Sequence, residues 1–307
     1  ILAFLIIQLP PGDYLTSYVA ELRRTGRQVT EDTLRALEEQ YGLNQPVYVQ
    51  YWKWITGFIQ GDMGRSFEYN RPVSELVGER IGLTIVVALS SLMFTWIVAF
   101  PIGIYSALNQ YSIGDYFFTF VSFIGLSVPN FMLALVLMFI GFNYLGIDVG
   151  GLFSPEYADA PWSMAKFINL LSHLWIPTIV IGTAGTAGLV RIMRANMLDE
   201  LQKPYVMTAK SKGLAHFRMI LKYPVRIALN PFISKVGWTL PRIISGAAIT
   251  SVVLNLPTTG PLMLEALKSQ DMYLAGSFIL LVSLLTVIGT FISDLLLAFI
   301  DPRIRFE

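Results

Sequence analysis

Side chains that could do chemistry are few in this sequence, and none of them has the spacing of a catalytic centre. There is no Cys, and the two His residues, His173 and His216, are too far apart to act as neighbouring ligands on one helix. The glycine-rich phosphate loop, the paired-histidine zinc motif and the nucleophile elbow are also absent. We therefore expect no catalytic residue, no metal site and no cofactor held by this chain.

Charged residues inside apolar segments are a second kind of candidate, because each such charge is costly in a membrane. Lys235 and Asp294 lie in two separate apolar segments, at similar expected depth. Their placement predicts a buried ion pair, and the alternative is that each side chain reaches the membrane surface separately. Arg242 lies about eleven residues into its segment, so we expect it near the middle of the bilayer, lining a solute path.

Three polar or helix-breaking residues, Ser127, Pro129 and Asn130, lie near the middle of another apolar segment. A proline removes one helix hydrogen bond and kinks the helix. Irregular backbone at membrane depth is tolerated only where protein or water covers it. The segment could therefore line a solute path, or the kink could serve packing alone, and both interpretations stay open.

The composition indicates that these residues are positioned by helices that cross a membrane. Apolar residues make up 54% of the 307 residues, and charged residues make up 14%, whereas a soluble domain has about 25% charged residues. The mean hydropathy is +0.58. The net charge of +1 gives no indication of nucleic-acid binding.

Five segments contain no Asp, Glu, Lys or Arg and are long enough to span a bilayer, for which about 20 apolar residues suffice. These segments are 81–114, 116–147, 167–190, 243–264 and 272–293, and the fourth is expected to begin earlier, near Pro231. Residues 1–9 are apolar but too few to cross, and we expect them to be the end of a further span; the core of a signal peptide is the alternative. The sequence therefore predicts an all-α integral membrane protein with about six transmembrane helices.

The distribution of basic residues predicts the orientation of these helices. Residues 191–226 contain eight basic and two acidic residues, and Arg303 and Arg305 follow the last span, so both regions are expected in the cytoplasm. Residues 148–166 and 10–80 are expected outside. Within 10–80 we expect a helix after Thr30 and an aromatic segment around Trp52, serving either as an interfacial layer over the spans or as a docking surface for an extracytoplasmic partner. The predicted division is thus the end of a span at 1–9, the extracytoplasmic helical element 10–80, and the transmembrane domain 81–307 with a cytoplasmic loop at 197–226.

The cytoplasmic loop is expected to contain a short helix. Pro204 suits the first position of a helix and Gly213 suits its end. Ala209 and Ser211 are small enough to allow close contact with another subunit, and we expect Ala209 to face that partner. A docking element and a solvated basic connector are both compatible with the composition.

The motif in this loop resembles the coupling loop of ABC importer permeases, in the form typical of the dipeptide and oligopeptide family. The residues that match it are Tyr205, Thr208, Ala209, Lys212, Gly213 and Leu214. Residues 41–46, 61–67, 293–295 and 301–305 are similar to other parts of the same family. The chain departs from the general pattern at Met207, at residues 225–226, and at residues 254–261 near the expected outer mouth, where the departure bears on which solute is carried.

This resemblance implies a type I permease fold and a division of labour between subunits. The permease would pair with a homologous second permease, two cytoplasmic ATPase subunits that hold ATP and magnesium, and an extracytoplasmic solute-binding protein. It would lie in the cytoplasmic membrane of a bacterium or archaeon and would itself catalyse nothing. The implied solute is a di- or oligopeptide, with an oligosaccharide or another small solute as the alternative.

A self-contained secondary transporter is the alternative from a different class. Such a protein would need a carboxylate near the middle of the membrane for ion coupling. Only Asp294 qualifies from the sequence, and it is expected near the end of its span.

Overall fold

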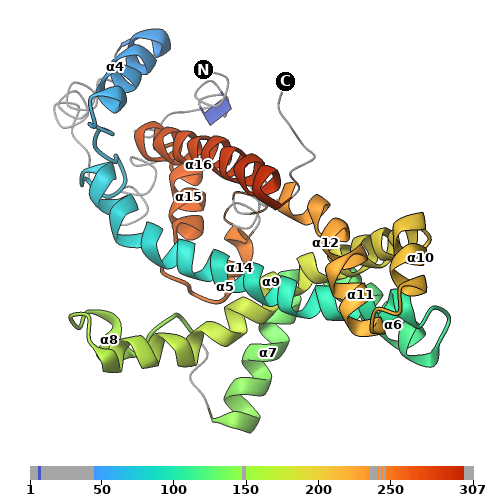
Figure 1. Ribbon diagram of the computed structural model, residues 1–307. Helices are drawn as coiled ribbons and strands as arrows, with labels where there is room; N and C mark the ends of the chain where they lie inside the picture. Colours follow the sequence, from blue (N-terminus) through green and yellow to red (C-terminus); the bar gives the residue numbers. More distant parts are fainter. Residues whose placement is uncertain are drawn as a thin grey trace. The chain divides into compact units, whose positions relative to one another are not determined.

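The computed structural model describes residues 6–7, 45–146, 150–234, 239, 241, 244 and 247–300, and these contain helices, turns and one isolated bridge between Arg65 and Pro72. Figure 1 labels the helices of these residues. In chain order they are α4 (Val47–Ile59), α5 (Val73–Leu108), α6 (Ile113–Ser127), α7 (Asn130–Leu145), α8 (Pro155–Ala158), α9 (Met164–Leu201), α10 (Pro204–Ser211), α11 (His216–Lys222), α12 (Pro224–Ala228), α14 (Ala248–Val253), α15 (Thr259–Lys268) and α16 (Met272–Ile300).

Among the described residues, three helices are long and apolar enough to cross a membrane, namely α5, α9 and α16. They contain 36, 38 and 29 residues, and about 20 are needed. Large apolar side chains remain exposed on each of them, for example Ile97, Leu171 and Phe291. Such surfaces are stable only against lipid or another protein. The predicted all-α membrane fold is confirmed.

The second predicted span, 116–147, is a broken pair of helices. The chain bends by 102° between α6 and α7, and Pro129, which has no N–H to donate, immediately precedes α7. The predicted kink is confirmed. If this pair counts as one span, the described part of the chain contains up to four spans. The predicted span at 1–9 lies largely outside the described residues. The predicted span at 243–264 is not one helix in its described part, because the chain turns at Asn255 and Pro257 between α14 and α15. Residues 235–238 and 245–246 lie outside the described residues, so the total of about six stays a prediction.

Helix α9 is longer than the predicted span at 167–190. It begins at Met164 and continues past Arg191 and Arg194 to Leu201, because arginine is a good helix former and a charge alone does not end a helix. At the other end, the Lys166 ammonium donates to the carbonyl oxygens of Ala158 at 3.1 Å and Ala160 at 2.6 Å. It also lies over the rings of Phe153 and Trp162. This buried cation joins residues 153–162 to the first turn of α9.

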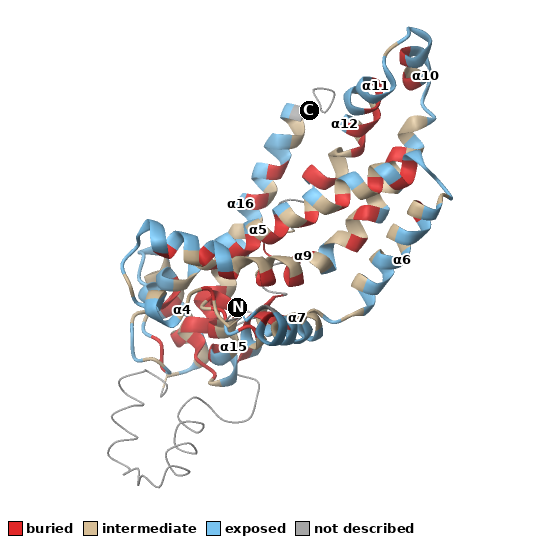
Figure 2. Cartoon of the chain, turned by 90° about the horizontal axis from the view of Figure 1, so that it is seen from below, coloured by how far each residue is buried: buried red, intermediate tan, exposed pale blue. Residues whose placement is uncertain are grey.

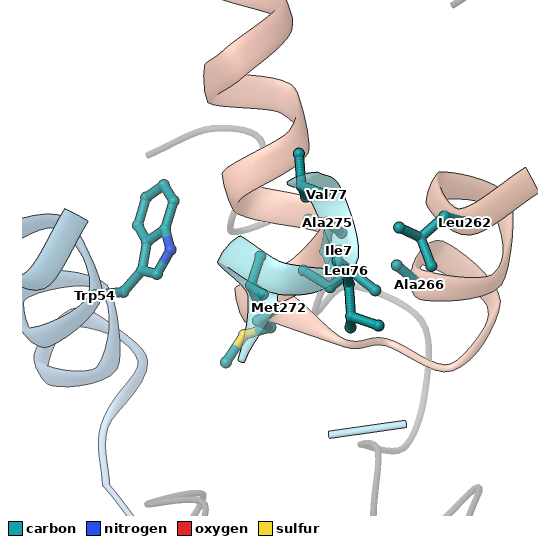
Figure 3. Packing of buried hydrophobic residues seen from close by; sticks show 10 residues of the cluster. Ile7, Trp54, Leu76, Val77, Leu262, Ala266, Met272 and Ala275 are labelled. Carbon is teal, nitrogen blue, oxygen red and sulfur yellow. The ribbon is translucent and has the colours of Figure 1, made fainter. Parts of the chain in front are cut away.

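The chain divides into two compact units, Ile1–Thr84 with Thr258–Leu284, and Ile85–Pro257 with Leu285–Glu307. The first unit has an apolar core that includes Ile7, Trp54, Leu262 and Met272 (Figure 3). The Trp54 indole N–H donates to the Ser277 hydroxyl at 3.1 Å. Other aromatic side chains of α4, among them Tyr48 and Trp52, are exposed. Helix α4 thus has one apolar face against this core and a second aromatic face, and the helix expected after Thr30 lies outside the described residues.

A buried carboxylate holds the loop before α5 in the first unit. The Asp271 carboxylate accepts hydrogen bonds from the Ser66 hydroxyl at 2.5 Å and the Phe67 N–H at 2.7 Å. Its other oxygen accepts from the Leu274 N–H at 3.1 Å and so caps the start of α16. Burial raises the pKa of the Asp271 carboxyl, and these hydrogen bonds oppose the rise. One side chain therefore fixes both residues 66–68 and a helix end.

Substitution of Ser66 tests this arrangement. The Ser66→Ala variant removes a donor to Asp271 and also the acceptor of the Tyr69 N–H. We expect the free energy of unfolding to fall by about 1–2 kcal/mol, since a buried donor and acceptor lose their partner. Thermal unfolding in detergent measures this loss, with exposed Ser74→Ala on α5 as the matched control. Equal unfolding temperatures for the two variants would contradict the assigned role.

Candidate functional site

The basic segment after α9 folds into three short helices, α10, α11 and α12. Pro204 is the first residue of α10, as the sequence predicts. Gly213 follows the end of this helix with φ of +71°, a left-handed conformation that favours glycine. The expected positions of the helix start and the glycine are confirmed.

An apolar cluster packs these short helices against the end of α9. Its members come from α5 and from α9 to α12, together with Phe232, and include Met193, Met197, Val206, Ala209, Met219, Ile220 and Val225. Ala209 is only 4% exposed, so its side chain faces this cluster and not a partner subunit, contrary to our expectation. The physical reason is that an eight-residue helix has about two turns, and Val206 and Ala209, three residues apart, form the face that it buries.

The remaining residues of the predicted motif hold α10 in place or lie on its surface. The Tyr205 hydroxyl donates to the Glu200 carboxylate, and the Thr208 hydroxyl donates to the Pro204 carbonyl at 3.0 Å. The Leu214 N–H donates to the Ala209 carbonyl at 3.4 Å. Lys212 is exposed. Part of the motif therefore stabilises α10 through hydrogen bonds within the chain, and part of it is exposed to solvent.

Helices α10 and α11 pack against each other, and both have exposed residues (Figure 2), of which we call the large apolar ones the apolar patch. Met207 is 64% exposed and Phe217 73% exposed, and Leu221 is also exposed. Basic residues lie beside them in the sequence: Lys210, Lys212, Arg218 and Lys222. Our sequence analysis missed Phe217 and Leu221. Their spacing of four residues places them on one face of a helix, and Met219 and Ile220 on the other face are buried. A short helix that is apolar on two faces was the signal in the sequence for an exposed apolar surface.

Substitutions at Gly213 test the helix end. An added Cβ would meet no atom within 4 Å, so any cost comes from the backbone conformation alone. We expect Gly213→Val to lower the free energy of unfolding by about 1–2 kcal/mol, and Gly213→Asn to lower it less, because Asn tolerates the left-handed region. Thermal unfolding in detergent measures both. A Val variant as stable as the Asn variant would contradict this explanation.

A cavity of about 480 Å³ lies in the second unit, and Asn130 is one of its lining residues. Side chains of Thr95, Trp96 and Phe232 also line it, together with the backbone near Gly185 and Gly188. Ser127 is exposed and its hydroxyl donates to the Phe123 carbonyl, and Pro129 is exposed at the bend. Of the residues predicted for a solute path, the structure places Asn130 at the cavity. Arg242 lies outside the described residues.

Helices α5 and α9 approach each other closely within this unit. The Thr95 hydroxyl donates to the Gly182 carbonyl at 2.9 Å. A Cβ at Gly182 would lie 2.6 Å from the Phe94 ring and 3.1 Å from the Ser91 carbonyl. Only glycine allows this contact between the two helices.

A buried ion pair, which the sequence analysis missed, joins α6 to α9. The Arg194 guanidinium donates to both carboxylate oxygens of Asp115, at 3.1 and 2.8 Å. The Tyr111 N–H donates to the same carboxylate at 3.0 Å. The side chain of Asp115 is 4% exposed and that of Arg194 is 28% exposed. A lone Asp between two apolar segments was the signal for such a partner.

The ion pair predicted between Lys235 and Asp294 stays a prediction. Lys235 lies outside the described residues, and Asp294 is exposed near the end of α16. Arg194 pairs with Asp115 and not with Asp294. Among the residues that the structure describes, no group of three or more acidic or histidine side chains could hold a metal ion.

Comparison with known proteins decides the family. Residues 99–306 match the family described as binding-protein-dependent transport system inner membrane component, and residues 1–90 match the N-terminal part described for the same kind of membrane component. The chain belongs to this family. The resemblance found in the sequence is confirmed, and this inner membrane component is a permease of a transport system.

The relatives of this inner membrane component resemble it along its whole length. The oligopeptide transport system permease protein AppB of Bacillus subtilis (strain 168) is 34% identical over 307 residues, covering 100% of this chain and 94% of the relative. The oligopeptide permease OppB of Haemophilus influenzae is 32% identical, with 99% and 93% covered. The dipeptide permease DppB of Escherichia coli (strain K12) is 27% identical, with 100% and 94% covered.

One stretch in which this inner membrane component departs from the expected pattern forms a tight turn after α14. The Leu256 N–H donates to the Ser251 carbonyl at 2.8 Å, and Asn255 has φ of +51°. The Leu254 carbonyl accepts from the Gly151 N–H at 2.9 Å, and the Leu254 and Leu256 side chains are buried. These apolar residues therefore anchor the turn within the chain.

Proposed function

We propose that this chain is the permease subunit of an ATP-driven importer for di- or oligopeptides. The observation that carries the proposal is the full-length similarity to permeases named for oligopeptide or dipeptide transport. The complete importer contains a homologous second permease, two cytoplasmic ATPase subunits that bind ATP and magnesium, and an extracytoplasmic solute-binding protein. It lies in the cytoplasmic membrane of a bacterium or archaeon, which this chain crosses several times.

The surface of α10 and α11 supports a docking role toward an ATPase subunit. Met207, Phe217 and Leu221 expose apolar side chains in a segment rich in basic residues. An exposed apolar patch with a polar rim is typical of a protein interaction site. The buried side of the same helices is continuous with α9 through the cluster around Met197. A force on this patch therefore reaches a membrane-spanning helix directly.

The cavity beside Asn130 supports a role for the second unit in the solute path. It combines a half-buried amide with the Trp96 and Phe232 rings and the Thr95 hydroxyl. A mixture of apolar walls with a few polar groups suits a peptide, whose backbone amides need hydrogen-bond partners. The second permease subunit completes the path in this proposal.

Purification and reconstitution test the proposed function. The complex is purified from the native host through a tag on this chain, and we expect two ATPase subunits and a second permease to be retained. Proteoliposomes with ATP inside and binding protein outside should import labelled tripeptides. Import of oligosaccharides in their place would support the alternative solute, and uptake by the lone chain without ATP would contradict the importer.

Accessible cysteines test the proposed orientation, since the chain has no Cys background. Single substitutions Asp159→Cys and Ser211→Cys are both at exposed positions. From the distribution of basic residues we expect an impermeant thiol reagent added outside to label Asp159→Cys alone. The reagent should label Ser211→Cys only after the membrane is opened. The reverse pattern would overturn the orientation.

The secondary-transporter alternative receives no support from the described helices. Asp294 is exposed near the end of α16, and Asp115 lies in the first turn of α6, paired with Arg194. Ion coupling needs a carboxylate that can change its protonation or ion near the middle of the membrane. Within the described spans, neither residue is at that position.

A further inference from the structure

A groove of about 240 Å³ lies between α6 and α9, within the second unit. Most of its lining is apolar, including Phe123, Leu126 and Ala187. One end is polar and is formed by Tyr111, Arg191 and Arg194. The ion pair of Arg194 with Asp115 fixes this polar end at the start of α6, and Gly125 lies against Thr183 at the apolar end.

The length of the groove corresponds to one leaflet of a bilayer. Its lining residues on α6 run from Tyr116 to Leu126, which at the rise of an α-helix is about 15 Å. The hydrocarbon core of a bilayer is about 30 Å thick. An elongated apolar group in the groove would therefore extend from the polar end to near the middle of the membrane.

The polar end carries a cation that is available to a ligand. Asp115 neutralises Arg194, whereas the exposed Arg191 has no ion-pair partner among the described residues. The region that begins at Arg191 contains eight basic and two acidic residues up to Arg226. The groove thus has a positive end, an apolar body and the length of an acyl chain. An amphiphile with an anionic head has the complementary chemistry.

We propose that this groove binds one anionic phospholipid of the cytoplasmic leaflet. Its phosphate lies at Arg191 beside the Tyr111 ring, and one acyl chain lies along Phe123 and Leu126. The inference rests on the proposed orientation, in which Arg191 faces the cytoplasm, and not on the identity of the solute. Lipid binding and peptide transport are measured separately, so the failure of one leaves the other testable.

Native mass spectrometry of the assembled, delipidated complex tests the proposal. Equal amounts of dioleoyl phosphatidylglycerol and dioleoyl phosphatidylcholine are added, and we expect preferential retention of phosphatidylglycerol. Arg191→Gln should lower the ratio of the two retained lipids about five-fold, which corresponds to about 1 kcal/mol for one basic residue at a membrane surface. Thr119→Phe, which fills the apolar part of the groove, should lower the retention of both lipids.

The matched control is Arg218→Gln, which removes another exposed arginine, from α11 and outside the lining of the groove. We expect it to leave the lipid ratio unchanged. Equal effects of the two arginine substitutions would overturn the proposal. Three further results would overturn it as well. The first is that Thr119→Phe leaves the retention of both lipids unchanged, and the second is that glycerol phosphate at equal concentration displaces phosphatidylglycerol. The third is that the lone chain retains the lipid but the complex does not. The last result would assign the groove to a partner subunit.

Discussion

Replacing Arg194 with Met is expected to lower the free energy of unfolding by about 3–5 kcal/mol, because it leaves the buried Asp115 carboxylate without its cation. The carboxylate is 4% exposed and accepts two hydrogen bonds from the Arg194 guanidinium. The hydrogen bond from the Tyr111 N–H is neutral and cannot offset the burial of a charge. Thermal or denaturant unfolding of the purified chain in detergent measures the loss.

The opposite substitution should cost less. In Asp115→Asn, the side-chain oxygen can still accept from the Tyr111 N–H, and the partly exposed Arg194 guanidinium can turn toward water. The double variant should therefore be no less stable than Arg194→Met alone, since neither charge is left buried. Additive losses in this double-mutant cycle would show that the two residues do not interact. Arg218→Met, at an exposed position on α11, serves as the control for loss of an arginine and should change stability by less than about 0.5 kcal/mol.

Replacing Ala209 with Trp should uncouple ATP hydrolysis from transport in the reconstituted importer. The side chain is buried among Met197, Val206 and Met219, where a Trp cannot fit without displacing α10. Overpacking of this kind typically costs about 1–3 kcal/mol. We expect both a lower unfolding temperature of the lone chain and loss of transport at normal solute binding by the extracytoplasmic partner. Ala209→Gly, which adds no volume, should retain more transport.

A second substitution separates internal packing from contact with a partner. Met207 lies on the exposed face of α10, so Met207→Asp should leave the unfolding temperature of the lone chain nearly unchanged. It should nevertheless weaken retention of the ATPase subunit, because it places a charge in the apolar patch. Lys210→Gln, at an exposed neighbouring position on the same helix, makes the same change of one unit of charge and serves as the control. Normal transport in both Ala209→Trp and Met207→Asp would show that this segment is only a solvated connector.

Local signals in the sequence predicted the ends of elements well. Pro204 and Gly213 marked the start of α10 and the turn after it, because each residue has a backbone preference that needs no tertiary context. Pro129 likewise marked the break before α7. The end of α9 was misplaced because we treated Arg191 as a membrane boundary, whereas the helix continues through it to Leu201.

Pairings between distant residues could not be predicted in the same way. Asp115 and Arg194 are 79 positions apart, and nothing in either local sequence specifies the other. The orientation of Ala209 depends on which face of a two-turn helix packs on α9, and small residues suit a buried face and an interface equally well. Predicting the groove beside Arg191 would require knowing how α6 and α9 pack together. These features arise from tertiary packing, which patterns in a single sequence do not specify.

The continuity of α9 has a mechanical consequence. Its 38 residues form a rod about 57 Å long, held by the Met197 cluster at one end and by the Lys166 ammonium at the other. If such a rod tilts by about 10° around its centre, each end moves by about 5 Å, close to the pitch of a helix. The two ends of the helix then move in opposite directions. A displacement of α10 would therefore produce a displacement in the opposite direction at residues 153–162, beyond the far end of α9.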